Sequence, residues 1–111
     1  MNYEQMSNNK LQLTGKIAKK PEFTHEVMGE NFYDSVLSVS RLSGQSDNIP
    51  ITVSDRFLTQ YDFEVGSTIS IIGQFRSYNK VENGKSRLLL TAFVRDVVDE
   101  TELENPNMIE L

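Results

Sequence analysis

The segment Gly73–Asn79, GQFRSYN, places an amide, a guanidinium and a phenol ring on one face of a predicted strand. Side chains two residues apart in a strand share a face, so Gln74, Arg76 and Tyr78 are spaced about 6–7 Å apart along it. A guanidinium binds anionic oxygens, and an aromatic ring stacks on a flat group. The pattern is typical either of an ordinary solvated face or of a surface that grips a flat, negatively charged ligand.

Further residues of the same chemistry lie elsewhere in the chain. The candidate ligands for anionic oxygens, besides Arg76, are Lys16, Arg41, Lys80, Lys85, Arg87 and Arg95. The candidate stacking rings, besides Tyr78, are Tyr33 and Phe93. In the last predicted strand, Arg87, Phe93 and Arg95 share one face.

Each candidate also has a purely structural interpretation. Tyr78 and Phe93 can pack in a subunit contact, and the neighbour of Tyr33 is Phe32, which indicates an apolar patch. Arg41 can pair with a nearby carboxylate, either Asp34 or Asp47, and Lys16 can belong to a solvated face.

The charge is unevenly distributed along the chain. The net charge is −5, but five of the 16 acidic residues lie in the last 13 residues, which contain no base. Residues 1–98 therefore carry 11 acids and 11 bases, and the segment 73–95 carries five bases against one acid, Glu82. A neutral body with clustered bases can present a basic stripe to a polyanion.

Hydrophobic alternation predicts the elements that position these residues. Strands are predicted over residues 10–18, 31–41, 49–54, 67–79 and 86–98, with a loop or a short excursion over 19–31. Phe57, Leu58 and Tyr61 indicate a helix of at most two or three turns, with Ser54 or Asp55 as its N-cap. The pair Asn83-Gly84 predicts a tight hairpin turn between the last two strands.

Three strands, a short helix and a long two-stranded hairpin predict an OB-fold, which is a five-stranded Greek-key barrel. Gly15 and Gly73 lie in mid-strand, where we expect tight bends, and Phe75 is predicted to be a core residue. Residues 1–8 are expected to be a flexible N-terminus, residues 9–98 the OB-fold domain, and residues 99–111 an acidic, disordered tail.

Several functional classes find no support in the sequence. There is no cysteine, and His25 with Glu22 and Glu26 is a thin basis for a metal site. No hydrolase or nucleotide-binding motif occurs, so we expect neither an enzyme nor a cofactor. No apolar run is long enough to span a membrane and no secretory signal is visible, which is compatible with a cytoplasmic protein.

Four segments resemble the bacterial single-stranded DNA-binding protein family. They are NKLQLTGKIAKKPE (Asn9–Glu22), LSVSR (Leu37–Arg41), ITVSDRFLTQYDFEVGSTISIIGQFRS (51–77) and RLLLTAFVRDV (87–97). The resemblance covers about residues 9–98. It implies an OB-fold that forms a homodimer or homotetramer and holds single-stranded DNA without sequence preference, in replication, recombination or repair near the nucleoid.

Two features depart from the family pattern. The chain has no tryptophan, and a short acidic tail replaces the family's long linker and acidic tip. The tail faintly resembles the family's partner-binding tip, which implies replication or repair proteins as its partners. The alternative function is a primosome-type OB-fold module for protein interactions, whose aromatic residues would lie in a dry interface and whose bases would be dispersed.

Overall fold

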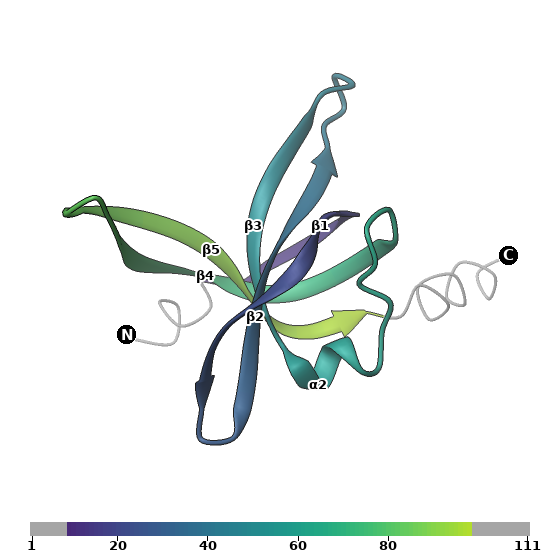
Figure 1. The fold of residues 1–111 in the computed structure, drawn as a ribbon. Coiled ribbons are helices and arrows are strands. Elements are labelled where there is room, and N and C mark those ends of the chain that lie inside the picture. Colours follow the sequence, from purple (N-terminus) through teal and green to yellow (C-terminus); the bar gives the residue numbers. More distant parts are fainter. Residues whose placement is uncertain (1–8, 99–111) are drawn as a thin grey trace, which may run out of the picture.

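A computed structural model describes residues 9–98 and shows a closed barrel of five strands in the order β1-β2-β3-β5-β4 (Figure 1). The elements are β1 (Leu11–Val27), β2 (Glu30–Ser40), β3 (Ser46–Ser54), α2 (Asp55–Leu58), β4 (Thr68–Glu82) and β5 (Lys85–Val98). This architecture confirms the predicted OB-fold. The predictions for residues 1–8 and 99–111, including the partner-binding role of the tail, fall outside the described residues.

β1 is much longer than the sequence predicted. Residues 19–27 do not form a loop but continue the strand, and Glu22, Phe23 and His25 are paired with β2. The ladder is irregular between Lys19 and Glu22, which leaves Pro21 without a register partner. A strand tolerates proline at such an irregularity because no ladder bond from the missing N–H is needed there.

The barrel encloses a single apolar cluster. Its buried members are Ile17, Leu37, Ile51, Val53, Phe57, Phe63, Ile69, Ile71, Ala92, Val94 and Val97. Phe57 comes from α2, which is shorter than predicted, and Leu58 and Tyr61 pack partly against the same cluster. The inward residues of the strands and one helical turn therefore form the core that holds the outer faces in place.

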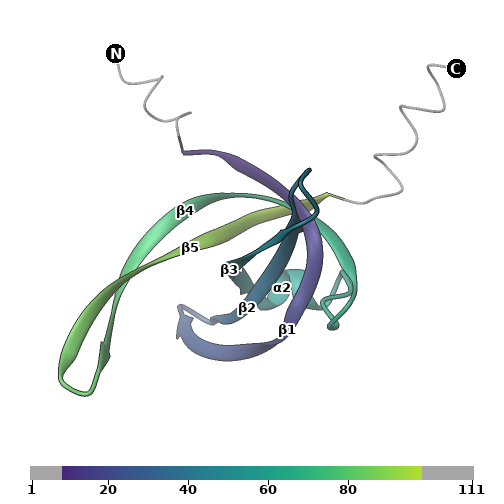
Figure 2. The same ribbon diagram turned by 90° about the horizontal axis from the view of Figure 1, so that it is seen from above.

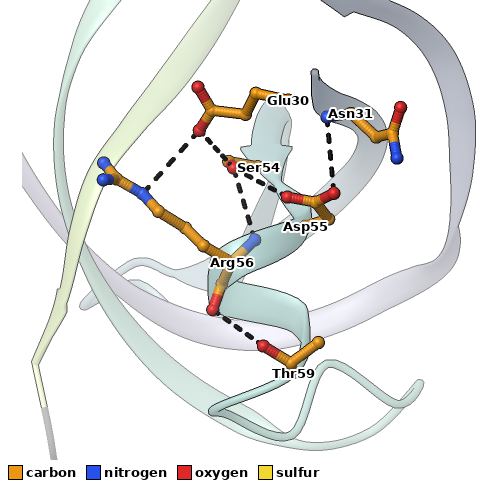
Figure 3. A network of polar contacts seen from close by, with 6 residues as sticks. All are labelled: Glu30, Asn31, Ser54, Asp55, Arg56 and Thr59. Carbon is orange, nitrogen blue, oxygen red and sulfur yellow. Dashed lines mark hydrogen bonds and ion pairs between the residues drawn. The ribbon is translucent and has the colours of Figure 1, made fainter.

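Ser54 is the N-cap of α2, as predicted, and connects the helix to the start of β2 (Figure 3). Its Oγ accepts a hydrogen bond from the backbone N–H of Arg56 at 3.3 Å and donates one to Glu30 at 2.5 Å. Arg56 also pairs with Glu30, at 3.8 Å between Nε and Oε2. The backbone N–H of Asn31 donates to Asp55 at 3.4 Å. The Arg56–Glu30 and Asn31–Asp55 contacts therefore both join α2 to the start of β2.

The two mid-strand glycines lie where backbones approach each other closely. A Cβ on Gly73 would collide with the carbonyl oxygen of Phe93, and one on Gly15 would collide with the carbonyl of Ser38. At Gly73 the ladder also skips a residue, because Val94 pairs with Gly73 and Asp96 with Ile72, which leaves Arg95 as a bulge. Both glycines therefore permit the strand bends that the sequence predicted.

Beyond Gly73, β4 and β5 continue as a long twisted hairpin, residues 74–93, which we call the arm and which extends away from the barrel toward its turn (Figures 1 and 2). Its turn is formed by Asn83 and Gly84, both with positive φ, as predicted. Phe75 is 41% exposed, so its prediction as a core residue is wrong. The reason is that β4 pairs with β1 only as far as Gly73, and the alternation continues past the end of the core.

Candidate nucleic-acid interface

The arm has two faces of opposite character. One face, the polar face, carries Gln74, Arg76, Tyr78 and Lys80, opposite Phe93, Thr91, Leu89 and Arg87 of β5. The other face carries Phe75, Ser77, Asn79 and Val81, opposite Ala92, Leu90, Leu88 and Ser86, and contains no charged residue. The arm therefore separates charged from apolar side chains by the two-residue period of its strands.

The polar face forms one wall of a groove of about 690 Å³, and the β1–β2 hairpin forms the other wall. Both hairpins extend to the same side of the barrel in Figure 2. The lining includes four predicted site residues: Arg76, Tyr78, Lys80 and Phe93. It also includes Lys19, Glu22, Phe23, Thr24, His25, Asp34, Thr52, Ser77, Asn79 and Thr91.

Arg76 lies over an aromatic ring of this wall. Its guanidinium carbon is 4.0 Å from the centroid of the Phe93 ring, within the range of a cation–π contact. With its amide oxygen turned toward Arg76, Gln74 accepts bonds of 3.0 Å from both Nε and Nη2. Phe93 and Gln74 thus both contact the guanidinium of Arg76, and the residue remains exposed.

Planar groups continue from Phe93 across the groove to the β1–β2 hairpin. The rings of Phe93 and Phe32 are 5.6 Å apart at 41°, and those of Phe32 and His25 are 5.2 Å apart at 19°. Arg76, Phe93, Phe32 and His25 therefore form a row drawn from four strands, which we call the planar row. The sequence analysis missed Phe32 and His25 as site residues, because the loop predicted over 19–31 hid the pairing of His25 with Phe32.

The floor between the walls is polar and internally bonded. The hydroxyl groups of Thr52 and Thr91 are 3.0 Å apart, and Thr52 also lies 3.1 Å from the carboxylate of Asp34, to which it donates. Thr91 donates to the carbonyl of Pro50 at 3.2 Å. The hydroxyl hydrogens of the floor are therefore already donated within the protein, while the cations lie on the walls.

The lysines on the walls are held by exposed ion pairs. Lys19 pairs with Glu22 at 3.2 Å and Lys80 with Glu82 at 3.5 Å. Arg87 approaches Glu82 at 4.0 Å near the end of the arm, where Lys85 is also exposed on the polar face. Such pairs contribute only about 0–1 kcal/mol each, so a phosphate can replace the carboxylate partner.

Seven predicted site residues lie outside the groove lining: Gln74, Lys85 and Arg87 belong to the polar face of the arm, and the other four lie elsewhere. Lys16 is exposed on β1, and Arg95 is exposed at the bulge in β5. Tyr33 is half-buried, packs against the core and meets Phe23 edge to face at 5.8 Å, so its position does not support a stacking role. Arg41 is near the tip of the β2–β3 hairpin.

Arg41 forms an ion pair with Asp47, one of the two carboxylates that the sequence analysis considered as its partner. Its Nε and Nη2 donate to Asp47 at 2.8 and 2.5 Å, a two-pronged contact. These hydrogen bonds lower the pKa of Asp47 below its usual range and raise the pKa of Arg41. Arg41, which the sequence analysis proposed as a phosphate ligand, therefore already has a carboxylate partner in Asp47.

Among residues 9–98, no helix is long and apolar enough to cross a membrane. The search of protein-family models and the search of curated proteins found no match.

Many solved structures share the fold, and two of them are described here. One is the dimeric structure of the N-terminal domain of PriB from Thermoanaerobacter tencongensis, at 45% identity and a TM-score of 0.70, covering 83% of this chain and 98% of that chain. The other is the Plasmodium falciparum SSB complex with ssDNA, at 15% identity and a TM-score of 0.64, covering 82% and 95%, which supports the fold alone. On the strength of the PriB identity, this chain belongs to the PriB-containing family of OB-fold proteins related to bacterial single-stranded DNA-binding proteins, as its sequence motifs predicted.

Proposed function

We propose that the protein is a non-catalytic, sequence-independent binder of single-stranded DNA in replication, recombination or repair, and that it acts in the cytoplasm. The observation that carries the proposal is the groove, in which Arg76, Tyr78, Lys80 and Phe93 come together beside the planar row. Unstacked bases would lie against the exposed rings and guanidinium, and phosphates would contact the cations on the walls. The Plasmodium falciparum neighbour, which shares the fold, was solved in complex with ssDNA, and we carry this kind of ligand over to the present chain as part of the proposal.

The alternative, a module for protein interactions only, is less well supported. It would place the aromatic residues in a dry interface and disperse the bases. Instead, Tyr78 remains 40% exposed and shares one groove with Arg76 and Lys80.

Titration with oligo(dT) tests the proposed function. We expect binding at about 50 mM salt and a roughly 15-fold loss of affinity at about 200 mM, because three phosphate contacts predict a logarithmic salt slope near −2 for a single strand. Fluorescence anisotropy of a labelled oligonucleotide would measure both values. No binding at the lower salt concentration would refute the proposal, and equal affinity at both concentrations would refute the phosphate contacts.

We also propose that the protein associates with itself through the apolar face of the arm. Phe75, Val81, Leu88 and Leu90 on this face are 41–71% exposed, and no charge interrupts them. Large contiguous apolar patches on a small protein mark interaction sites. The PriB relative is dimeric, which favours a second copy of this chain as the occupant.

Replacing Leu90 with glutamate should dissociate the assembly. In a two-fold contact each copy would bring its new carboxylate into the apolar interface, and burying unpaired charges is costly. Sedimentation should show the wild type as an oligomer and Leu90→Glu as a monomer. Leu42→Glu is the matched control, because Leu42 is equally apolar and fully exposed but lies in the β2–β3 loop. A variant that stays oligomeric would place the interface elsewhere.

A further inference from the structure

His25 lies on the β1–β2 hairpin, in the wall of the groove that faces the arm. Its exposed ring stacks nearly parallel on Phe32, at 5.2 Å and 19°, and forms the end of the planar row. Phe32 itself is only 8% exposed, so it supports the imidazole from below. The imidazole therefore presents a fixed flat surface to the groove on the side opposite Arg76.

Two hydrogen bonds determine which nitrogen of His25 carries the proton. The Oγ1 of Thr24 donates to the carbonyl oxygen of Phe32 at 3.1 Å and lies 2.8 Å from Nδ1 of His25. Since a hydroxyl has one hydrogen, which the carbonyl takes, Thr24 can only accept from the imidazole. Nδ1 is then the donor, and Nε2 of the neutral ring is the nitrogen that gains a proton on acidification.

The charges that share the groove with His25 come from three strands. Lys19 and Glu22 lie on β1, Asp34 on β2, and Arg76 and Lys80 on β4, whereas β3 and β5 contribute only uncharged side chains to the lining. Three cations and two carboxylates leave one net positive charge. A proton on His25 would double this net charge and add an N–H donor at Nε2.

From this geometry we propose that His25 is a further residue of the single-stranded DNA surface, and that its protonation on acidification strengthens binding. Neutral His25 would contribute a stacking plane for a base. Protonated His25 would also attract a phosphate through Nε2–H. The inference rests on the proposed function, because its ligand is the same strand in the same groove.

Oligo(dT) affinities at about pH 7.5 and pH 5.5 and constant salt test the inference, since thymine does not titrate in this range. We expect the wild type to bind about three- to tenfold more tightly at the lower pH, with a salt slope steeper by about 0.7. His25→Phe retains a ring but no charge, so it should lose the increase on acidification. His25→Ala should also lose at least about fivefold at pH 7.5, because the stacking plane is gone.

The outcomes separate the inference from the function on which it rests. If the wild type binds equally at both pH values, or if His25→Phe retains the increase, the inference is wrong while the proposed function stands. If the wild type binds at neither pH in low salt, the proposed function itself is wrong, and the inference falls with it. His25 is exposed, so thermal melts of both variants should match the wild type and exclude misfolding as the cause of any loss.

Discussion

Replacing Arg76 with alanine should weaken oligo(dT) binding by about 10- to 100-fold. The change removes a phosphate ligand, the flat guanidinium on Phe93 and the partner of Gln74 together. A stacking contact alone contributes about 1–3 kcal/mol, and the lost charge should reduce the salt slope by about 0.7. Anisotropy titrations at several salt concentrations measure both effects.

Two other arginine variants sharpen this expectation. Arg76→Lys keeps the charge but loses the planar fork, so it should retain the salt slope and still lose several-fold in affinity. Arg41→Ala is the matched control, since it removes an exposed guanidinium that Asp47 already occupies outside the groove. If Arg41→Ala weakened binding as much as Arg76→Ala, the groove would not be the binding site.

Replacing Gly73 with alanine should destabilise the fold by about 3 kcal/mol. In an open strand the same change is slightly stabilising, because alanine loses less backbone entropy on folding than glycine. Here the new methyl group meets the carbonyl oxygen of Phe93, which cannot move without breaking the β4–β5 ladder. Urea unfolding should show the loss directly, and the melting midpoint should fall by more than about 10 °C.

The comparison variant for this test is Ser86→Ala on the arm. Ser86 is exposed in β5, and its replacement should change the free energy of unfolding by less than about 0.5 kcal/mol. If Gly73→Ala lowered the free energy of unfolding by less than about 1 kcal/mol, β4 and β5 could move apart at little cost. That result would contradict the close approach of their backbones at Gly73.

Most of the fold could be predicted from the sequence because local signals agree there. Alternation identified all five strands, Asn83-Gly84 identified the turn of the arm, and Ser54 was correctly proposed as a cap. The second half of β1 was not predicted as strand, because Pro21 and Gly29 are residues typical of loops. Only the pairing with β2, which depends on residues distant in sequence, shows that the strand tolerates Pro21 at an irregularity.

The candidate site was predictable only on one wall. Arg76 and Tyr78 were identified from alternation within a single strand, and Phe93 from its partner strand. His25 and Lys19 belong to the wall that was taken for a loop. Phe75 was misplaced for a related reason: alternation indicates which side chains share a face, but it does not show where that face leaves the core.

The arm has a consequence for the kind of ligand that the groove can accept. Residues 76–91 of the arm have ladder partners only within its own two strands, and a two-stranded ribbon of this kind has marginal stability by itself. Its twist can therefore adjust at low energetic cost, whereas the wall anchored in the β1–β2 ladder is held by the barrel. We expect a groove with one compliant wall to follow strands whose bases differ in size, which would favour the sequence-independent binding proposed above.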